Sequence, residues 1–491
     1  MKKSIKKNYV YNLIYQVLVI IIPIITIPYV SRVLGARNIG IYGYTLSISA
    51  YFILIGSLGV ALYGQREIAY VQSNKKAYSK KFWEISLLRM FTISIATIIY
   101  YLVFVKTNHT YGIYFKILLL EIFGNAIDIS WFFQGLEEFA KTVSRNLIVK
   151  IISLICIFVF VKTKNDLLIY FLIYVLSIII GNLSLWLYMP KYIEKINFKS
   201  LNIFKHLKPT IALFIPQAAI QIYTILDRTM IGAIISEKAE VGFYTQGEKI
   251  IKLLLTIITA MGTVMLPRIA NRFAEKDNKA IKAYIFKSFN LVFILAFPLM
   301  FGIISVSKSF VPLFFGPGYS KVVPIMMFLS PIIVLIGMSN VIGMQYLLPT
   351  KKQKEFTMSV ICGAITNFII NMFLIKRYGA IGAAIATFIA EFIVTTIQLI
   401  LVRKNFEFKN IMKITRPYLI SSVIMFIICL IISNIIKSNF YSIIFQVIIG
   451  ASVYFLILLI MKDSFLLETK NTLLKYLSRV HYSYKEKRNR D

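Results

Sequence analysis

The sequence consists of long apolar runs separated by short polar gaps, and this pattern is typical of a chain that crosses a membrane many times. A helix needs roughly 20 apolar residues to span the hydrocarbon core. Because lipid offers no hydrogen bonds to the backbone, such runs predict an all-α polytopic membrane protein with about 14 transmembrane helices. The runs are 9–31, 39–65, 82–105, 112–133, 146–161, 167–189, 209–235, 241–267, 284–305, 322–348, 357–375, 380–402, 417–436 and 439–461.

The basic residues set the expected orientation. Most of the 55 Lys and Arg lie in every second gap between runs. Cytoplasmic loops of membrane proteins carry such an excess, so we predict that both termini are cytoplasmic. A net charge of +34 would suggest a nucleic-acid partner for a soluble protein. Here the charges are divided among short loops, where they contact membrane lipid headgroups, and no nucleic-acid partner is expected.

A weak internal repeat suggests two bundles. With an offset of 202 residues, Ile39–Tyr42 aligns with Val241–Tyr244, and Arg66 aligns with Arg268. A shift of six spans keeps the orientation, so two six-helix bundles would be parallel repeats with a substrate site between them. The alternative is that small-residue turns recur by chance at helix starts. The predicted parts are an N-terminal six-helix bundle (1–189), a cytoplasmic linker (190–208), a C-terminal six-helix bundle (209–404), two additional transmembrane helices (405–462) and a basic cytoplasmic tail (463–491).

Polar side chains recur on single helical faces in three of the spans, which predicts a hydrated cavity, because charge at mid-bilayer is costly. Intramembrane basic residues outnumber acidic ones by one. Basic, amide and hydroxyl groups together suit a ligand that is anionic at one place and hydroxyl-rich elsewhere. The residues predicted to bind substrate are Arg32, Arg37, Arg89, Lys116, Asn125, Lys150, Gln217, Gln221, Arg228, Lys249 and Lys252. Those predicted to couple transport to an ion are Glu121, Asp128, Asp227, Glu248 and Glu391.

Two of these pairs also have a purely structural interpretation. Glu248 and Lys252 can form an ion pair one helical turn apart that neutralises itself. Asp227 and Arg228 can reach the interface from a helix end. Both alternatives stay open at the level of sequence.

Sequence motifs for catalysis are missing. The chain contains no P-loop, no GxSxG elbow and no HExxH motif, and His109, His206 and His481 are scattered. The three cysteines show no paired spacing, so no metal or other cofactor is expected. The short gaps on the outer side leave no room for the catalytic loops of a polymerase. A transporter is therefore predicted rather than an enzyme.

Four segments resemble the Wzx-type polysaccharide-repeat flippases of the multidrug/oligosaccharidyl-lipid/polysaccharide exporter superfamily. They are Pro28–Gly35 (PYVSRVLG), Ile39–Tyr44 (IGIYGY), Tyr63–Ala69 (YGQREIA) and Gln345–Lys352 (QYLLPTKK). The resemblance covers nearly the whole chain in length and number of spans. It implies two six-helix bundles, a basic lumen, and two extra spans.

The same resemblance implies the substrate and the place of action. The substrate would be an undecaprenyl-pyrophosphate-linked oligosaccharide repeat unit, moved across the bacterial cytoplasmic membrane by alternating access for capsule, exopolysaccharide or O-antigen biosynthesis. The polysaccharide polymerase machinery would be a partner, and an ion gradient could supply the energy. Two alternatives from the same superfamily are a drug or cation antiporter and a lipid II flippase.

Overall fold

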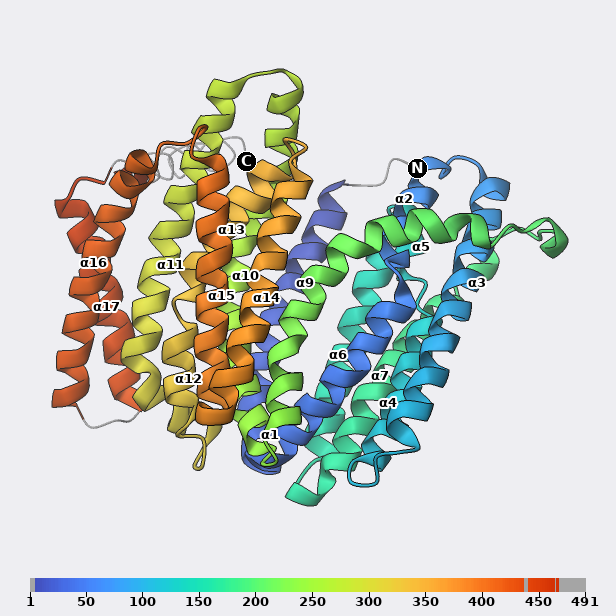
Figure 1. The fold of residues 1–491 in the computed structure, drawn as a ribbon, viewed down its shortest axis with the longest axis horizontal. Helices are drawn as coiled ribbons and strands as arrows, with labels where there is room; N and C mark the ends of the chain where they lie inside the picture. The colour runs from blue at the N-terminus through green and yellow to red at the C-terminus, as the bar shows by residue number, and fades with distance from the viewer. Residues whose placement is uncertain (1–4, 437–439, 464, 468–491) are drawn as a thin grey trace, which may run out of the picture. The chain divides into compact units, whose positions relative to one another are not determined.

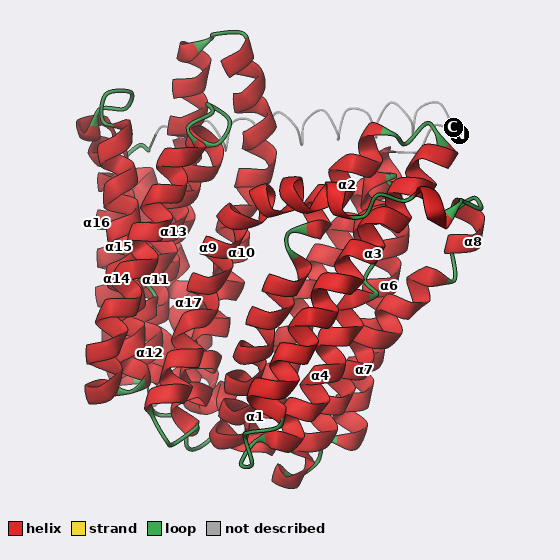
Figure 2. Cartoon of the chain, turned by 45° about the vertical axis from the view of Figure 1, so that its right-hand side comes forward, coloured by secondary structure: helices red, strands yellow, loops and turns green. Residues whose placement is uncertain are grey.

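The computed structural model describes residues 5–436, 440–463 and 465–467, and every regular element in these ranges is helical (Figure 2). This confirms the prediction of an all-α membrane protein. The chain divides into two compact units. Unit 1 comprises residues 1–246, 314–322 and 364–386, and unit 2 comprises residues 247–313, 323–363 and 387–491.

Helices α1 to α9 belong to unit 1, and all of them except α8 are labelled in Figure 1. They are α1 (Ile5–Ser57), α2 (Val60–Tyr70), α3 (Lys75–Tyr100), α4 (Gly112–Ala126), α5 (Ser130–Gly135), α6 (Phe139–Phe160), α7 (Leu167–Trp186), α8 (Met189–Tyr192) and α9 (Leu207–Ile234).

The later helices belong to unit 2 or pass from one unit into the other. They are α10 (Ala239–Ala274), α11 (Asn278–Phe315), α12 (Val322–Leu329), α13 (Ile332–Ser339), α14 (Gln353–Tyr378), α15 (Ala380–Val402), α16 (Phe408–Ile435) and α17 (Phe440–Ile460).

Within the described residues, 11 helical stretches are long and apolar enough to cross a membrane. Each of the 14 apolar runs falls on helical segments. Part of the difference in number arises at α1, which holds one complete predicted run and most of the next in a single element. The other two runs fall on α4, which has only 15 residues, and on α9, and neither helix is among the 11 stretches. Gly35 interrupts α1 with φ 76° and ψ 166°. Side chains disfavour positive φ, so glycine allows the chain to turn there without a loop.

The core of unit 1 is made by contacts between helices, many of which are far apart in the sequence. Contacts join α1 with α3, α4, α6 and α9, and α7 with α4 and α6. At one end of this group, Phe82 of α3 stacks against Trp131 of α5, with ring centroids 5.8 Å apart. Both rings are almost fully buried. This packing holds the short helix α5 against α3, just beyond the end of α4.

The linker is fixed to unit 1 through Glu84 of α3. The carboxylate is fully buried. It accepts hydrogen bonds from the backbone N–H of Asn202 at 2.9 Å and from His206 Nε2 at 3.0 Å, and pairs with Lys205 Nζ at 2.7 Å. His206 Nδ1 lies 2.7 Å from the hydroxyl of Tyr63 on α2. A buried carboxylate is tolerated when it is paired and hydrogen-bonded in this way, so α2, α3 and the linker form one connected structure.

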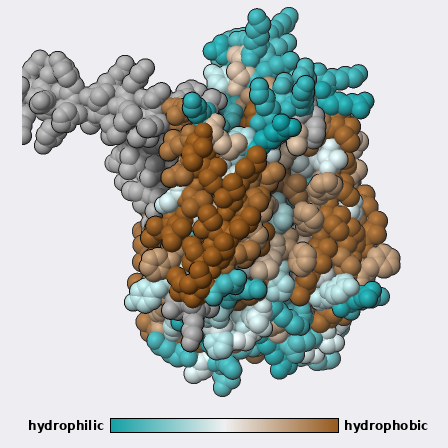
Figure 3. Space-filling model, turned by 90° about the vertical axis from the view of Figure 1, so that its left-hand side faces the viewer, coloured by the Kyte–Doolittle hydropathy of each residue, from teal (hydrophilic) through white to brown (hydrophobic). Residues whose placement is uncertain are grey.

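In unit 2, α16 and α17 form a helical hairpin against α11. The hydroxyl of Tyr418 on α16 donates to Asn290 Oδ1 at 2.9 Å, and that of Tyr454 on α17 donates to the carbonyl of Ile294 at 2.9 Å. The opposite faces of the hairpin expose large apolar side chains, among them Ile427, Ile448 and many neighbours. Figure 3 shows them as an apolar belt between polar rims. Such a belt is the surface expected in contact with hydrocarbon chains.

Candidate functional site

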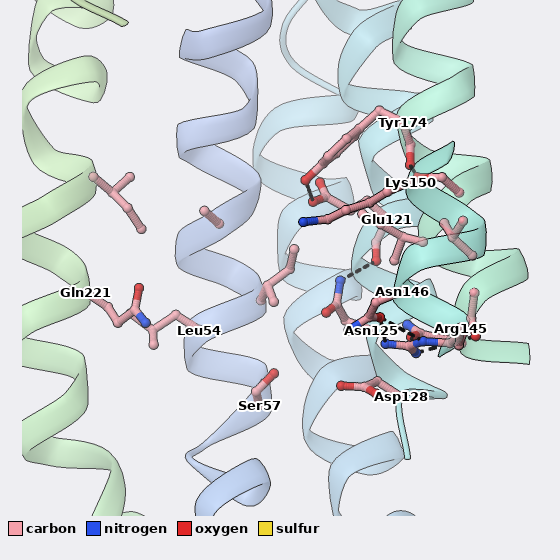
Figure 4. A pocket seen from close by; sticks show the side chains of 18 residues that line it. Leu54, Ser57, Glu121, Asn125, Asp128, Arg145, Asn146, Lys150, Tyr174 and Gln221 are labelled. Atoms are coloured by element: carbon pink, nitrogen blue, oxygen red, sulfur yellow. Dashed lines mark hydrogen bonds between the residues drawn. The ribbon is translucent and has the colours of Figure 1, made fainter. Parts of the chain in front are cut away.

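A polar cavity of about 580 Å³ lies inside unit 1, between α1, α4, α6, α7 and α9 (Figure 4). Five of its lining residues are among those predicted from sequence. They are Glu121, Asn125, Asp128, Lys150 and Gln221. Six further polar lining residues are not predicted from sequence: Ser57, Arg145, Asn146, Tyr174, Ser177 and Asn182. The lining carries two basic and two acidic side chains, so the predicted excess of positive charge is not found in this cavity.

Glu121 is the buried acid of the cavity. It belongs to α4 and is 3% exposed. The hydroxyl of Tyr174 on α7 donates to Glu121 Oε1 at 2.8 Å, and the hydroxyl of Ser49 on α1 donates to Oε2 at 2.9 Å. Lys150 of α6 extends into the same part of the cavity (Figure 4). Three helices thus converge on one carboxylate, which gives this part of the cavity a fixed arrangement of donors and charge.

Arg145 forms a second group in the cavity, where α6 and α7 approach closely. Its Nη1 donates to Asn182 Oδ1 at 2.9 Å and its Nε donates to Asn146 Oδ1 at 3.0 Å. Asn182 Nδ2 in turn donates to the carbonyl of Gly124 on α4 at 2.8 Å. Amide side chains that are already oriented by such bonds present their remaining donors and acceptors in fixed directions, which suits the binding of hydroxyl-rich molecules.

Arg89 does not line the cavity, but it shapes one side of it. It is 4% exposed on α3. Its Nε donates to the carbonyl of Asn125 at 2.9 Å, near the end of α4, and its Nη2 lies 3.5 Å from Asp128 Oδ2. Asp128 Oδ1 accepts from the backbone N–H of Ser130 at 2.9 Å, at the start of α5. The guanidinium therefore stabilises the break between α4 and α5, because helix ends leave carbonyl and N–H groups unsatisfied.

A second polar cluster in unit 1 surrounds Asp227 of α9. Asp227 is 5% exposed. Tyr244 of α10 donates to Oδ2, and Asn371 Nδ2 of α14 donates to Oδ1 at 2.7 Å. Asn371 also donates to Asn367 Oδ1 at 3.0 Å. Because Asp227 is buried among these groups, the alternative of a carboxylate that reaches the interface does not describe it; Arg228 beside it is partly exposed.

The remaining predicted residues lie elsewhere. Arg32 and Arg37 are exposed beside the turn at Gly35, and Lys116 is exposed on α4 outside the cavity lining. Gln217 belongs to α9, but its side chain lies outside the described part of the structure.

In unit 2, Glu248 Oε1 and Lys252 Nζ are 2.5 Å apart on α10, which is the self-neutralising pair considered from sequence. Lys249 is partly exposed beside it, and Glu391 is buried on α15. Among the described residues, no group of three or more His, Cys, Asp and Glu could hold a metal ion.

Comparison with known proteins places the chain in a family. The model of a family described as "Polysaccharide biosynthesis protein" matches residues 5–273, which is more than half of the chain. The chain belongs to the polysaccharide biosynthesis protein family. This family member is 25% identical over 408 residues to a putative O-antigen transporter of Escherichia coli (strain K12), and the match covers 82% of this chain and 98% of the relative.

The fold of this polysaccharide biosynthesis protein is also found in solved transporter structures. The lipid II flippase MurJ in an inward closed conformation matches with a TM-score of 0.64 at 19% identity, over 90% of this chain and 99% of that one. An inward-facing multidrug resistance MATE family transporter of the MOP superfamily gives 0.64 at 13% identity, over 83% and 96%. The resemblance to Wzx-type flippases of this superfamily is therefore confirmed. The chain is a multi-pass membrane protein among transporters of polysaccharide biosynthesis.

Proposed function

We propose that this protein translocates an undecaprenyl-pyrophosphate-linked oligosaccharide repeat unit across the bacterial cytoplasmic membrane. The observation that carries the proposal is a cavity among membrane-spanning helices in which two cations lie beside a set of amide and hydroxyl groups. The family match and the O-antigen transporter relative support the same substrate class. The glycan would serve O-antigen, capsule or exopolysaccharide assembly.

The cavity carries groups that suit both polar parts of this substrate. Lys150 and Arg145 provide positive charge for the pyrophosphate, because ammonium and guanidinium groups form strong charge-assisted hydrogen bonds with phosphate oxygens. Asn125, Asn146 and Gln221 provide amide donors and acceptors for sugar hydroxyls. The lipid chain would stay in the bilayer while the polar part crosses. Alternating access of the cavity to the two sides would then complete translocation.

Replacement of one basic side chain can test whether the cavity binds substrate. Lys150→Met removes an ammonium from the cavity, and Lys116→Met is the matched control, because Lys116 is an exposed lysine on α4 outside the lining. A lost charge-assisted hydrogen bond is worth about 1.5–3 kcal/mol, so translocation should fall roughly ten- to hundredfold in Lys150→Met. Lys116→Met should translocate at the wild-type rate.

The measurement is made in cells that lack the chromosomal copy of the gene and express one variant. It records how much of the glycan on lipid-linked repeat units has reached the outer leaflet. An impermeant enzyme added outside digests only glycan that has reached the outer leaflet. Protected units should accumulate without the protein and with Lys150→Met. Full outward display without the protein would remove the proposal. Equal transport of a lipid-linked peptidoglycan precursor would favour the lipid II flippase alternative instead.

We further propose that Asp227 and Glu121 couple translocation to an ion gradient. Each is a buried carboxylate that accepts hydrogen bonds from neutral side chains, and such a group can accept a proton or a monovalent cation without a large rearrangement. Asp227→Asn and Glu121→Gln keep the shape of the side chain and remove the charge. Both should abolish the dependence of transport on the membrane ion gradient. Transport that keeps its gradient dependence in both variants would remove the coupling role.

A further inference from the structure

A second void, of about 350 Å³, runs along the seam between α6 and α7. Its lining forms one stripe on each helix. On α6 the stripe is Val149, Ile152, Ser153, Cys156 and Phe160, and on α7 it is Ile169, Leu172, Ile173, Leu176, Ser177 and Ile180. Both stripes follow the helical period, so the groove has a continuous wall along each side.

The groove is apolar even at its two serines. Ser153 donates its hydroxyl to the carbonyl of Val149 at 2.8 Å, and Ser177 donates to the carbonyl of Tyr174 at 2.6 Å. Each hydroxyl is therefore satisfied within its own helix and offers no donor to a ligand. Ile152 and Ile180 are 54% and 60% exposed. In a membrane-spanning pair of helices, exposed side chains of this kind face hydrocarbon, so the groove opens toward the lipid.

The groove adjoins the polar cavity through shared lining residues. Val149 and Ser177 line both voids. On α6 the lining of the cavity extends from this junction to Arg145, and the lining of the groove extends the other way to Phe160. A site with cationic side chains and an apolar site thus adjoin along the same pair of helices. A molecule whose anionic group is covalently joined to a long apolar chain matches both sites at once.

We infer that the α6/α7 groove holds the polyprenyl chain of the transported lipid while its pyrophosphate and glycan occupy the cavity. The inference rests on the proposed function. An ordinary phospholipid fits the junction less well, because Val149 lies near the middle of α6 (Phe139–Phe160), whereas phospholipid headgroups stay at the bilayer surface. The chain therefore leaves the protein between α6 and α7.

Filling the groove provides the first test. Cys156→Trp places an indole in the groove, and Ile155→Trp is the matched control, because Ile155 is the neighbouring residue, exposed to lipid, and is not part of the lining. Purified protein in vesicles is given two substrates that carry the same pyrophosphate glycan, one on a long polyprenyl chain and one on a short chain.

In this assay the wild type and Ile155→Trp should translocate the long-chain substrate faster than the short-chain one. Cys156→Trp should lower long-chain transport by roughly tenfold and leave short-chain transport nearly unchanged. Equal transport of both substrates by the wild type and by Cys156→Trp would overturn the inference and leave the proposed function standing. No translocation of either substrate by the wild type would instead overturn the proposed function, and the inference with it.

A second measurement uses the unaltered protein and does not depend on how the variant folds. A polyprenyl pyrophosphate that carries a photoreactive group along its chain is incorporated into the vesicles and illuminated. Crosslinks should map to the peptides that contain Cys156 and Leu172, and excess unlabelled polyprenyl pyrophosphate should suppress them. Suppression by added phospholipid to the same extent would mean that bulk lipid fills the groove, and would overturn the inference.

Discussion

Gly40 and Gly242 lie 202 residues apart in the chain and pack directly against each other where α1 passes the start of α10. A methyl group at Gly40 would overlap the carbonyl oxygen of Lys238, and one at Gly242 would overlap the carbonyl oxygen of Ala36. These contacts are reciprocal, because Ala36 and Lys238 are also 202 residues apart. The offset found in the sequence therefore relates two segments that touch each other in the same way in both directions.

This reciprocal contact predicts that neither glycine tolerates a side chain. Gly40→Ala should force the two backbones apart and lower the yield of folded protein, because the obstructing atoms belong to the main chain. Gly302→Ala is the control, since a methyl group there has open space in helix α11. That substitution should be neutral or stabilise by up to about 1 kcal/mol. Thermal unfolding in detergent would compare the variants, and equal midpoints for both would contradict the prediction.

Arg89 should matter for stability more than for substrate binding. Arg89→Met removes the bond to the carbonyl of Asn125 and the pairing with Asp128, each of which involves a buried charged donor, so this variant should unfold at a clearly lower temperature than the wild type. Arg89→Lys should restore little of this loss, because one ammonium cannot reproduce the separate bonds from Nε and Nη2. The control is Arg272→Met, which breaks an exposed pair with Glu275 worth at most about 1 kcal/mol. Similar midpoints for Arg89→Met and Arg272→Met would disprove the structural role.

Attachment of the linker at His206 should weaken in acid. Burial lowers the pKa of His206 below its ordinary value of 6.5, although Glu84 and Glu67 oppose this and Lys205 adds to it. A lowered pKa means that the unfolded linker binds a proton more readily than the docked one. The stability from this residue is therefore complete above pH 6.5 and is lost as the pH falls from 6.5 through the lower pKa of the docked state.

Tryptophan fluorescence can follow this change, because Trp83 packs against Phe198 of the linker with ring centroids 5.3 Å apart. Emission should shift as the pH falls below about 6.5 in the wild type. His206→Gln keeps a hydrogen-bonding side chain that does not titrate, so its emission should change less over the same range. An identical shift in the wild type and in His206→Gln would assign the effect to another group.

Tyr174 and Ser49 donate hydrogen bonds to Glu121, and their contribution to stability should depend on the negative charge of that carboxylate. Tyr174→Phe removes one hydrogen bond to a carboxylate, which is worth about 1.5–3 kcal/mol. In a Glu121→Gln background the same substitution should cost less, so the double-mutant cycle should give a favourable coupling energy. Tyr114→Phe is the control, because Tyr114 stacks its ring on Phe171 with centroids 4.8 Å apart, and this contact is kept. Additive effects in the cycle would show that Tyr174 acts independently of Glu121.

The helices could be predicted from sequence because apolar runs of membrane length leave the backbone no alternative to internal hydrogen bonding. Hydropathy does not identify all of the polar side chains that line the cavity. The fifth apolar run, 146–161, leaves Arg145 in a gap and Asn146 at its border, whereas α6 begins at Phe139. A polar first turn resembles a loop to any measure of hydropathy. Tyr174 and Asn182 give no signal of a charged stripe, because α7 carries no charged residues.

Helical phase alone could not say which charged residues share a cavity. Lys116 and Glu121 both lie on α4, five residues apart, yet only Glu121 lines the cavity. Arg89 appeared as an isolated intramembrane charge, and its role became visible only with the break between α4 and α5 in place. Such roles depend on contacts between residues far apart in sequence, for which a single chain gives no periodic signal.

The burial of Glu84 also bears on the order in which the chain can fold during synthesis. Its hydrogen-bond partners Asn202 and His206 follow it by 118 and 122 residues. Domains usually fold as units from the N-terminus while the chain is being made. Until the linker emerges, the carboxylate of Glu84 would lack the partners that compensate its burial. Completion of the first group of helices is therefore tied to the arrival of the segment that leads into α9, and a ribosome that stalls before Asn202 would leave that group open.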